Sequence, residues 1–199
     1  MNSLSIRAGV VAAALLAAAC SSSSSSPSTS HGSEAGPIPQ AFAAKWCTGT
    51  LKTDKELMPP QKGGGWLGDG SVHAPAGTTF LVSPEFGQWN GYAFLSDGTP
   101  AAIAGDIQTG LAAGTDFTST CATDPNTMST HFILLAPAQL YAKADLSGTP
   151  CSLAVGLELT NAVYSGGDVP QLAGDQIQAR CGFRTGYAST LSYGMLITP

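Results

Sequence analysis

The sequence predicts an all-β fold, an antiparallel β-sandwich or barrel-like domain with two disulfides and at most short helices. Three observations support this prediction. Gly and Pro are frequent, with 24 and 13 residues, as is typical of chains with many turns. Short runs of strand-forming residues recur between clusters of turn residues. Of the five cysteines, all but Cys20 lie beyond residue 45, and an even number there is typical of a disulfide-bonded exported domain.

The strands are expected in runs where apolar and polar residues alternate or where β-branched and aromatic residues gather between turn residues. These runs are Thr78–Ser83, Trp89–Ser96, Thr115–Ala122, Thr130–Leu135, Gln139–Ala144, Cys151–Leu159, Gln176–Arg184 and Leu191–Thr198. Signals for helices are few. Asp106 is a possible cap for a short helix that runs to Gly114, and Thr53 or Asp54 for one that Pro59 ends.

The four cysteines of the domain are expected to form two disulfides. Their spacing offers no C-x₂-C pair, which argues against a zinc site or a redox-active pair. Four cysteines allow three connectivities, and the alternation of the strands is the only guide. Ile177, Ala179, Cys181 and Phe183 share one face of their run, and Cys151 shares a face with Leu153. We therefore expect the bonds Cys151–Cys181 and, by exclusion, Cys47–Cys121.

The charge balance argues against a nucleic-acid partner. The formal net charge is −5, and loss of Arg7 with an N-terminal signal makes it −6. Between Gly63 and Ala179 the only Lys or Arg is Lys143, although this stretch holds most of the acidic residues. Because phosphate contacts need clustered Lys and Arg, a nucleic acid is excluded. The acidic stretch is either a solvated surface or a region that attracts cations.

The N-terminus carries an export signal. Arg7 precedes the apolar run Ala8–Ala19, which is too short to span a bilayer but fits a signal peptide. The run ends Leu16-Ala17-Ala18-Ala19-Cys20. This ending resembles the lipobox of bacterial lipoproteins, although such boxes favour Leu where Ala17 stands. The alternative is ordinary secretion after cleavage at an Ala-x-Ala site.

The lipoprotein resemblance implies an anchor at Cys20. In that family the Cys becomes a lipidated N-terminus that carries a diacylglyceryl group and acyl chains such as palmitate. Ser21 after the Cys then implies sorting to the outer membrane, if the host has one. The serine tract Ser21–Ser26 behaves as a flexible tether. We therefore expect a signal peptide in residues 1–19, a lipidated Cys and disordered tether in 20–45, and one β-rich domain in 46–199.

No specific catalytic motif is present. The sequence has no G-x-S-x-G, H-E-x-x-H or P-loop pattern, and the glycine-rich segment 63–70 lacks the Lys-Ser/Thr of a phosphate cradle. His73 lies four residues after Asp69, so this pair is the strongest candidate for a general base. His131 begins an apolar run and is expected to be a partly buried strand residue.

Other residues are candidates for binding. Trp66 and Trp89 form a sugar-stacking platform if they are exposed, whereas Trp46 is expected to pack against a disulfide. Arg180 and Arg184 lie on the outward face of one expected strand, where they bind a carboxylate or pair with a nearby acid. No cofactor is indicated, and calcium remains the alternative because oxygen ligands occur in the expected turns at Asp97, Asp124, Asn126, Asp145 and Asp168.

These observations favour a non-catalytic binding or envelope-structural β-domain that a lipid anchors to the membrane. Its ligand would be a small molecule, a glycan or a protein. Two alternatives stay open: a secreted hydrolase with a site near Asp69 and His73, and a barrel that carries a small apolar ligand.

Overall fold

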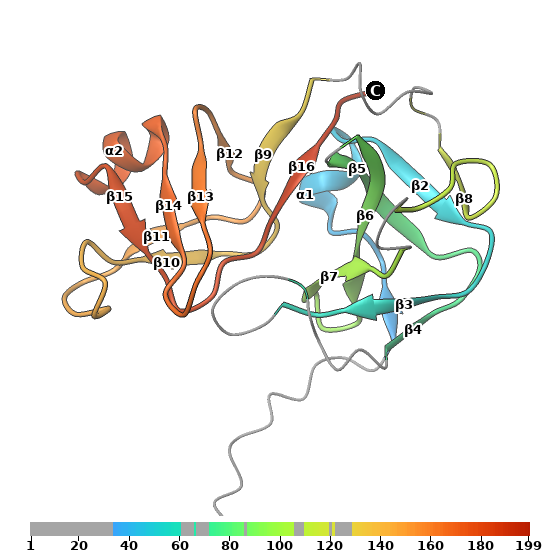
Figure 1. Cartoon of the computed structure of the whole chain (residues 1–199), viewed down its shortest axis with the longest axis horizontal. Coiled ribbons are helices and arrows are strands. Elements are labelled where there is room, and N and C mark those ends of the chain that lie inside the picture. Colours follow the sequence, from blue (N-terminus) through green and yellow to red (C-terminus); the bar gives the residue numbers. More distant parts are fainter. Residues whose placement is uncertain are drawn as a thin grey trace, which may run out of the picture. The chain divides into compact units, whose positions relative to one another are not determined.

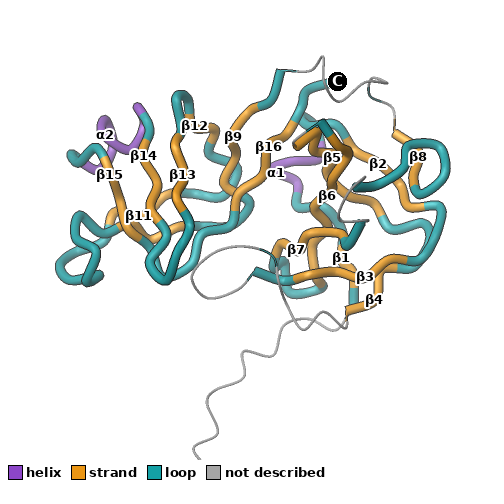
Figure 2. Tube along the Cα trace, in the orientation of Figure 1, coloured by secondary structure: helices purple, strands orange, loops and turns teal. Residues whose placement is uncertain are grey.

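The computed structural model describes residues 34–60, 66, 72–85, 87–105, 110–119, 121 and 129–199, all of which belong to one compact unit, His31–Pro199. The predicted fold class is confirmed. Almost all regular structure in these residues is antiparallel β-sheet, and helices are restricted to α1 (Gln40–Ala43) and α2 (Asp175–Cys181) (Figures 1 and 2). Neither of these helices is long and apolar enough to cross a membrane.

The largest sheet curls on itself. Its strand order is β4 (Val72–Ala74), β3 (Lys55–Met58), β7 (Pro100–Ile103), β6 (Gln88–Leu95), β5 (Thr79–Glu85), β2 (Thr48–Leu51) and β8 (Phe117–Ser119). The short strand β1 (Ala35–Gly36) pairs with the far end of β6, and a parallel bridge joins Glu34 to His73 of β4. The pairings β4–β3–β7–β6–β1 therefore close into a ring, which gives the sheet its barrel-like character.

Three smaller sheets complete the described part of the fold. One has the order β12 (Glu158–Leu159), β9 (His131–Leu134) and β16 (Tyr193–Leu196). Another has the order β13 (Val163–Ser165), β14 (Gln171–Ala173) and β15 (Thr185–Tyr187), and β10 (Ala138–Leu140) pairs with β11 (Cys151–Leu153). In Figure 1 the strand β16 lies between β9 and the β5–β6 hairpin, so it joins the smaller sheets to the large one.

The period of two along β6 separates two hydrophobic clusters. Trp89, Ala93 and Leu95 face the first cluster, which fills the curl of the large sheet around Phe80. Tyr92 and Phe94 face a second cluster that lies against β9 and β16. Because β9 has this cluster on one side and a third cluster on the other, its apolar residues are continuous rather than alternating.

Both predicted disulfides are present, Cys47–Cys121 and Cys151–Cys181. Two disulfides are compatible with an exported protein. The strand predicted over Gln176–Arg184, on which the Cys151–Cys181 pairing rested, is nevertheless wrong, because this run contains helix α2. Ile177 and Cys181 are four residues apart and so share the buried face of the helix, whereas Ala179 is exposed. A left-handed Gly182 ends the helix.

Other expectations need correction. The helix expected after Thr53 or Asp54 is strand β3, and the long run Cys151–Leu159 is divided by a turn with Gly156 at φ 76° into β11 and β12. The expected tether extends too far, because the fold already includes β1 and α1. Phe42 of α1 is fully buried and stacks on Phe94, at a distance of 5.4 Å between ring centroids. The helix expected from Asp106 to Gly114 is wrong over residues 110–114, which form isolated bridges and a turn, whereas residues 106–109 lie outside the described residues.

Candidate functional site

The sequence-predicted site residues that the structure describes lie on several different elements. His73 on β4 has a side chain that is 62% exposed, and its ion-pair partner is Asp54, at 3.4 Å between Nε2 and Oδ2. Asp69, like Cys20, lies outside the described residues. Trp89 is only 7% exposed and belongs to the core, so the predicted exposed stacking platform is wrong for this residue. Trp66 is partly exposed and lines a cavity.

The predicted arginine pair does not share a strand face. Arg180 lies in the last turn of α2, and Arg184 follows the helix; both are exposed. Neither forms an ion pair with Asp168 or Asp175 in the described structure, and Asp175 instead accepts a hydrogen bond from Asn161 Nδ2 (2.7 Å).

Of the expected calcium ligands, Asp97 and Asp145 accept backbone N–H groups of their own turns, both at 2.9 Å. Asp124 and Asn126 lie outside the described residues. Among the residues that the structure does describe, no three His, Cys, Asp or Glu side chains are grouped as a metal site would require.

A cavity with both apolar and polar lining lies beside Glu85, at the end of the β5–β6 hairpin, and has a volume of about 360 Å³. We call it the Glu85 cavity. Its polar lining comes from Glu85, Gln88 and Asn90, and its apolar lining includes Met58, Trp66, Tyr92, Ala102 and Ile103. Small-molecule sites typically have volumes of about 300–1,000 Å³ and combine apolar walls with a few polar groups. The Glu85 cavity meets both conditions.

The Glu85 carboxylate is held in place through one of its two oxygens. Glu85 Oε1 accepts hydrogen bonds from the hydroxyl of Tyr92 (2.6 Å) and the backbone N–H of Met195 (3.2 Å). Ser83 Oγ lies 2.9 Å from the same oxygen and 2.8 Å from the Met195 carbonyl, so its one proton serves either acceptor. Glu85 Oε2 receives no hydrogen bond from any described residue. A fixed carboxylate therefore offers one oxygen to a ligand.

Tyr92 positions this carboxylate because its own place is fixed. A Cβ at Gly194 of β16 would lie 2.7 Å from the Tyr92 ring, so only glycine there allows the ring to pack against the strand. Burial, and after it the charge of Glu85, raise the pKa of the Tyr92 hydroxyl well above its usual value. The hydroxyl therefore stays protonated at neutral pH and remains a donor to Glu85.

The alternation of β6 explains how one short segment builds the polar part of the cavity. Gln88, Asn90 and Tyr92 lie on one face of the strand, and Glu85 is directly opposite Gln88 in the antiparallel register. The connection between the strands is tight and includes Gly87 in the left-handed region, at φ 73°. Asn90 Nδ2 donates to the Glu85 carbonyl (3.3 Å), which ties the two strands together beside the cavity.

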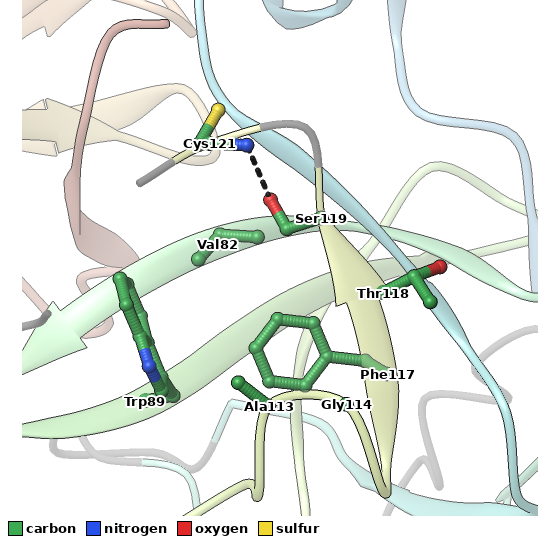
Figure 3. Close-up of a pocket in the computed structure, with 8 residues that line it drawn as sticks. All are labelled: Val82, Trp89, Ala113, Gly114, Phe117, Thr118, Ser119 and Cys121. Atoms are coloured by element: carbon green, nitrogen blue, oxygen red, sulfur yellow. Dashed lines mark hydrogen bonds between the residues drawn. The ribbon is translucent and has the colours of Figure 1, made fainter. Parts of the chain in front are cut away.

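A second cavity, of about 270 Å³, lies on the opposite face of β6. Trp89 and Phe117 form its walls, with their rings 6.4 Å apart in an edge-to-face arrangement, and Cys121 lies nearby (Figure 3). Figure 3 shows that the polar atoms near this Trp89 cavity belong mainly to Thr118 and Ser119, and Ser119 Oγ already accepts the Cys121 N–H (3.1 Å). Its lining is therefore mainly apolar.

A third cavity, of about 410 Å³, contains an ion network that the sequence did not suggest. His131 Nδ1 lies 2.7 Å from Glu158 Oε1, and Lys45 Nζ donates to Glu158 Oε2 (2.8 Å). Lys45 first, and then His131, lower the pKa of Glu158. The arrangement orients an imidazole, as a general base requires. The Thr160 hydroxyl in this cavity accepts a hydrogen bond from Gln176 Nε2 (2.8 Å), and Thr130 also lines it.

Sequence reasoning missed Glu85 as a site residue. The available signal was a buried strand, Phe80 to Pro84, that ends in a carboxylate, followed by Gln88 and Asn90 on one face of the next strand. No protein-family model, curated protein or solved structure matches the chain.

Proposed function

We propose that the protein is an exported, lipid-anchored binding protein whose β-domain holds a small polar ligand in the Glu85 cavity. The observation that carries the proposal is the Glu85 carboxylate, which three neighbouring groups fix through Oε1 while Oε2 has no donor among the described residues. A binding site gains affinity when its polar groups are held in the bound geometry before the ligand arrives.

Two other features support binding rather than catalysis. Neither His73 nor His131 lines the Glu85 cavity, so the described lining lacks an imidazole base beside the carboxylate. The apolar Trp89 cavity, at about 270 Å³, is smaller than typical ligand sites, which favours the Glu85 cavity over an apolar carrier function.

Filling each cavity in turn tests the binding site. Ala104 is a half-buried residue of the Glu85 cavity, and Ala113 is an exposed residue at the Trp89 cavity. We expect Ala104→Phe to weaken binding of small probes at least about tenfold, because the new ring occupies the ligand's space. Ala113→Phe is the matched control and should leave binding unchanged. Calorimetry with choline, dimethylbutanol and methyl glucoside measures both. Equal binding by the two variants would rule out the Glu85 cavity.

The anchor needs a separate experiment, because Cys20 lies outside the described residues. We expect Cys20→Ala, expressed in the native host, to leave the membrane fraction and to lack the mass of the acyl chains. Each buried CH₂ contributes about 0.8 kcal/mol to membrane binding, so loss of the chains removes the attachment. Unchanged partition into detergent, with an unchanged mass, would mean that the protein is not lipidated.

A further inference from the structure

The charge that lines the Glu85 cavity restricts the ligand. Glu85 is the only charged residue among the described residues of the lining, and no Lys, Arg or His joins it there. A ligand that enters displaces water from Oε2, and an anionic oxygen that loses water needs a donor or a positive charge in return. A neutral hydroxyl supplies a donor, whereas a cation supplies the opposite charge as well.

The aromatic walls favour the cation. The rings of Trp66 and Tyr92 both line the cavity and contact each other, at an angle of 47° with centroids 5.1 Å apart. The faces of aromatic rings carry negative electrostatic potential, and Trp attracts cations most strongly. The cavity thus combines a carboxylate with two rings, which is the combination that recognises ammonium groups.

The surrounding sequence acts in the same direction. Lys143 is the only Lys or Arg between Gly63 and Ala179, the stretch that supplies every residue of the cavity except Met58. The formal net charge of the chain, −5, attracts cations at long range and speeds their association. Asn90, which also lines the cavity, adds an amide oxygen for which the structure shows no donor among the described residues.

We propose that the ligand of the Glu85 cavity is a small organic cation, a quaternary or primary ammonium compound whose charged head lies between Glu85 and the rings of Trp66 and Tyr92. This inference rests on the proposed function, because it names the ligand class of the same site. A cavity of about 360 Å³ accommodates a compact head group rather than a polymer. A neutral sugar ring, which stacks on Trp and bonds to amides, is the main competitor.

The experiment compares three probes on the purified protein by calorimetry. Choline carries the charge, dimethylbutanol replaces its nitrogen with carbon at nearly the same shape, and methyl glucoside represents a sugar ring. We expect choline to bind at least about tenfold more tightly than either neutral probe, since only choline gains a desolvated cation–π contact. The comparison uses the native protein, so it does not depend on how a variant folds.

Two variants then test whether the preference for choline over the neutral probes depends on the Glu85 carboxylate. Glu85→Gln keeps the shape but removes the charge, and should reduce the preference for choline at least about fivefold. Glu56→Gln removes an exposed charge from β3, outside the cavity, and should retain the preference. Equal preference in these two variants would overturn the assignment to Glu85.

The other outcomes separate the two proposals. If dimethylbutanol or methyl glucoside binds as tightly as choline, and Ala104→Phe abolishes that binding, the cavity is a ligand site but the cation proposal is wrong. If no probe shows binding that is sensitive to Ala104→Phe, both proposals are contradicted.

Discussion

The two cavities on opposite faces of β6 differ in chemistry although one strand lines both. On one face Asn90 and Tyr92 stand beside a fixed carboxylate; on the other, Trp89 contacts Phe117 and Val82 within a hydrophobic cluster. The Trp89 cavity lies within the packing that holds the curled sheet together. The Glu85 cavity contains a partly buried polar network that an apolar core does not need, and a satisfied network of this kind fixes its members in one arrangement.

The largest expected difference between the two faces is in stability, when the tryptophan of each face is replaced by alanine. Trp89→Ala should lower the free energy of unfolding by about 3–5 kcal/mol, because it removes a buried aromatic side chain. Trp66→Ala should lower it by about 1 kcal/mol, since Trp66 is partly exposed. Urea denaturation measures both values.

The loss of choline affinity should be larger for Trp66→Ala than for Trp89→Ala, which is the reverse of the order expected for the loss of stability. We expect Trp66→Ala to weaken choline binding about fivefold, equivalent to about 1 kcal/mol of cation–π interaction. The Trp89→Ala protein that remains folded should bind choline as the native protein does. A Trp66 variant that is the less stable of the two, with normal binding, would reverse the roles assigned to the two faces.

The sequence predicted the parts of the fold that depend on local alternation. Strands β5 and β6 follow from their apolar patterns, and the two disulfides follow from the even number of cysteines. The same alternation placed Trp89 on the face of Ala93 and Leu95, so its burial was predictable although an exposed role was considered. Helix α2 was missed because Ile177 and Cys181 satisfy a period of two and a helical period equally.

The candidate site depends on contacts between distant segments, and for that reason the sequence did not reveal it. Glu85 becomes a fixed ligand group only because β16 brings the N–H of Met195 to its carboxylate, across 110 positions of the chain. The close packing of Tyr92 on Gly194 likewise requires β16 to cross beside the hairpin. Neither contact leaves a periodic signal near Glu85.

The most direct test of the account is a titration of the isotope-labelled protein with choline, followed through the indole N–H resonances of Trp66 and Trp89. These two indoles report on the two faces of β6, and Trp46, the third tryptophan, serves as an internal reference. We expect the Trp66 resonance to shift progressively with choline while the Trp89 resonance stays in place. A shift of Trp89 with a stationary Trp66 would contradict it.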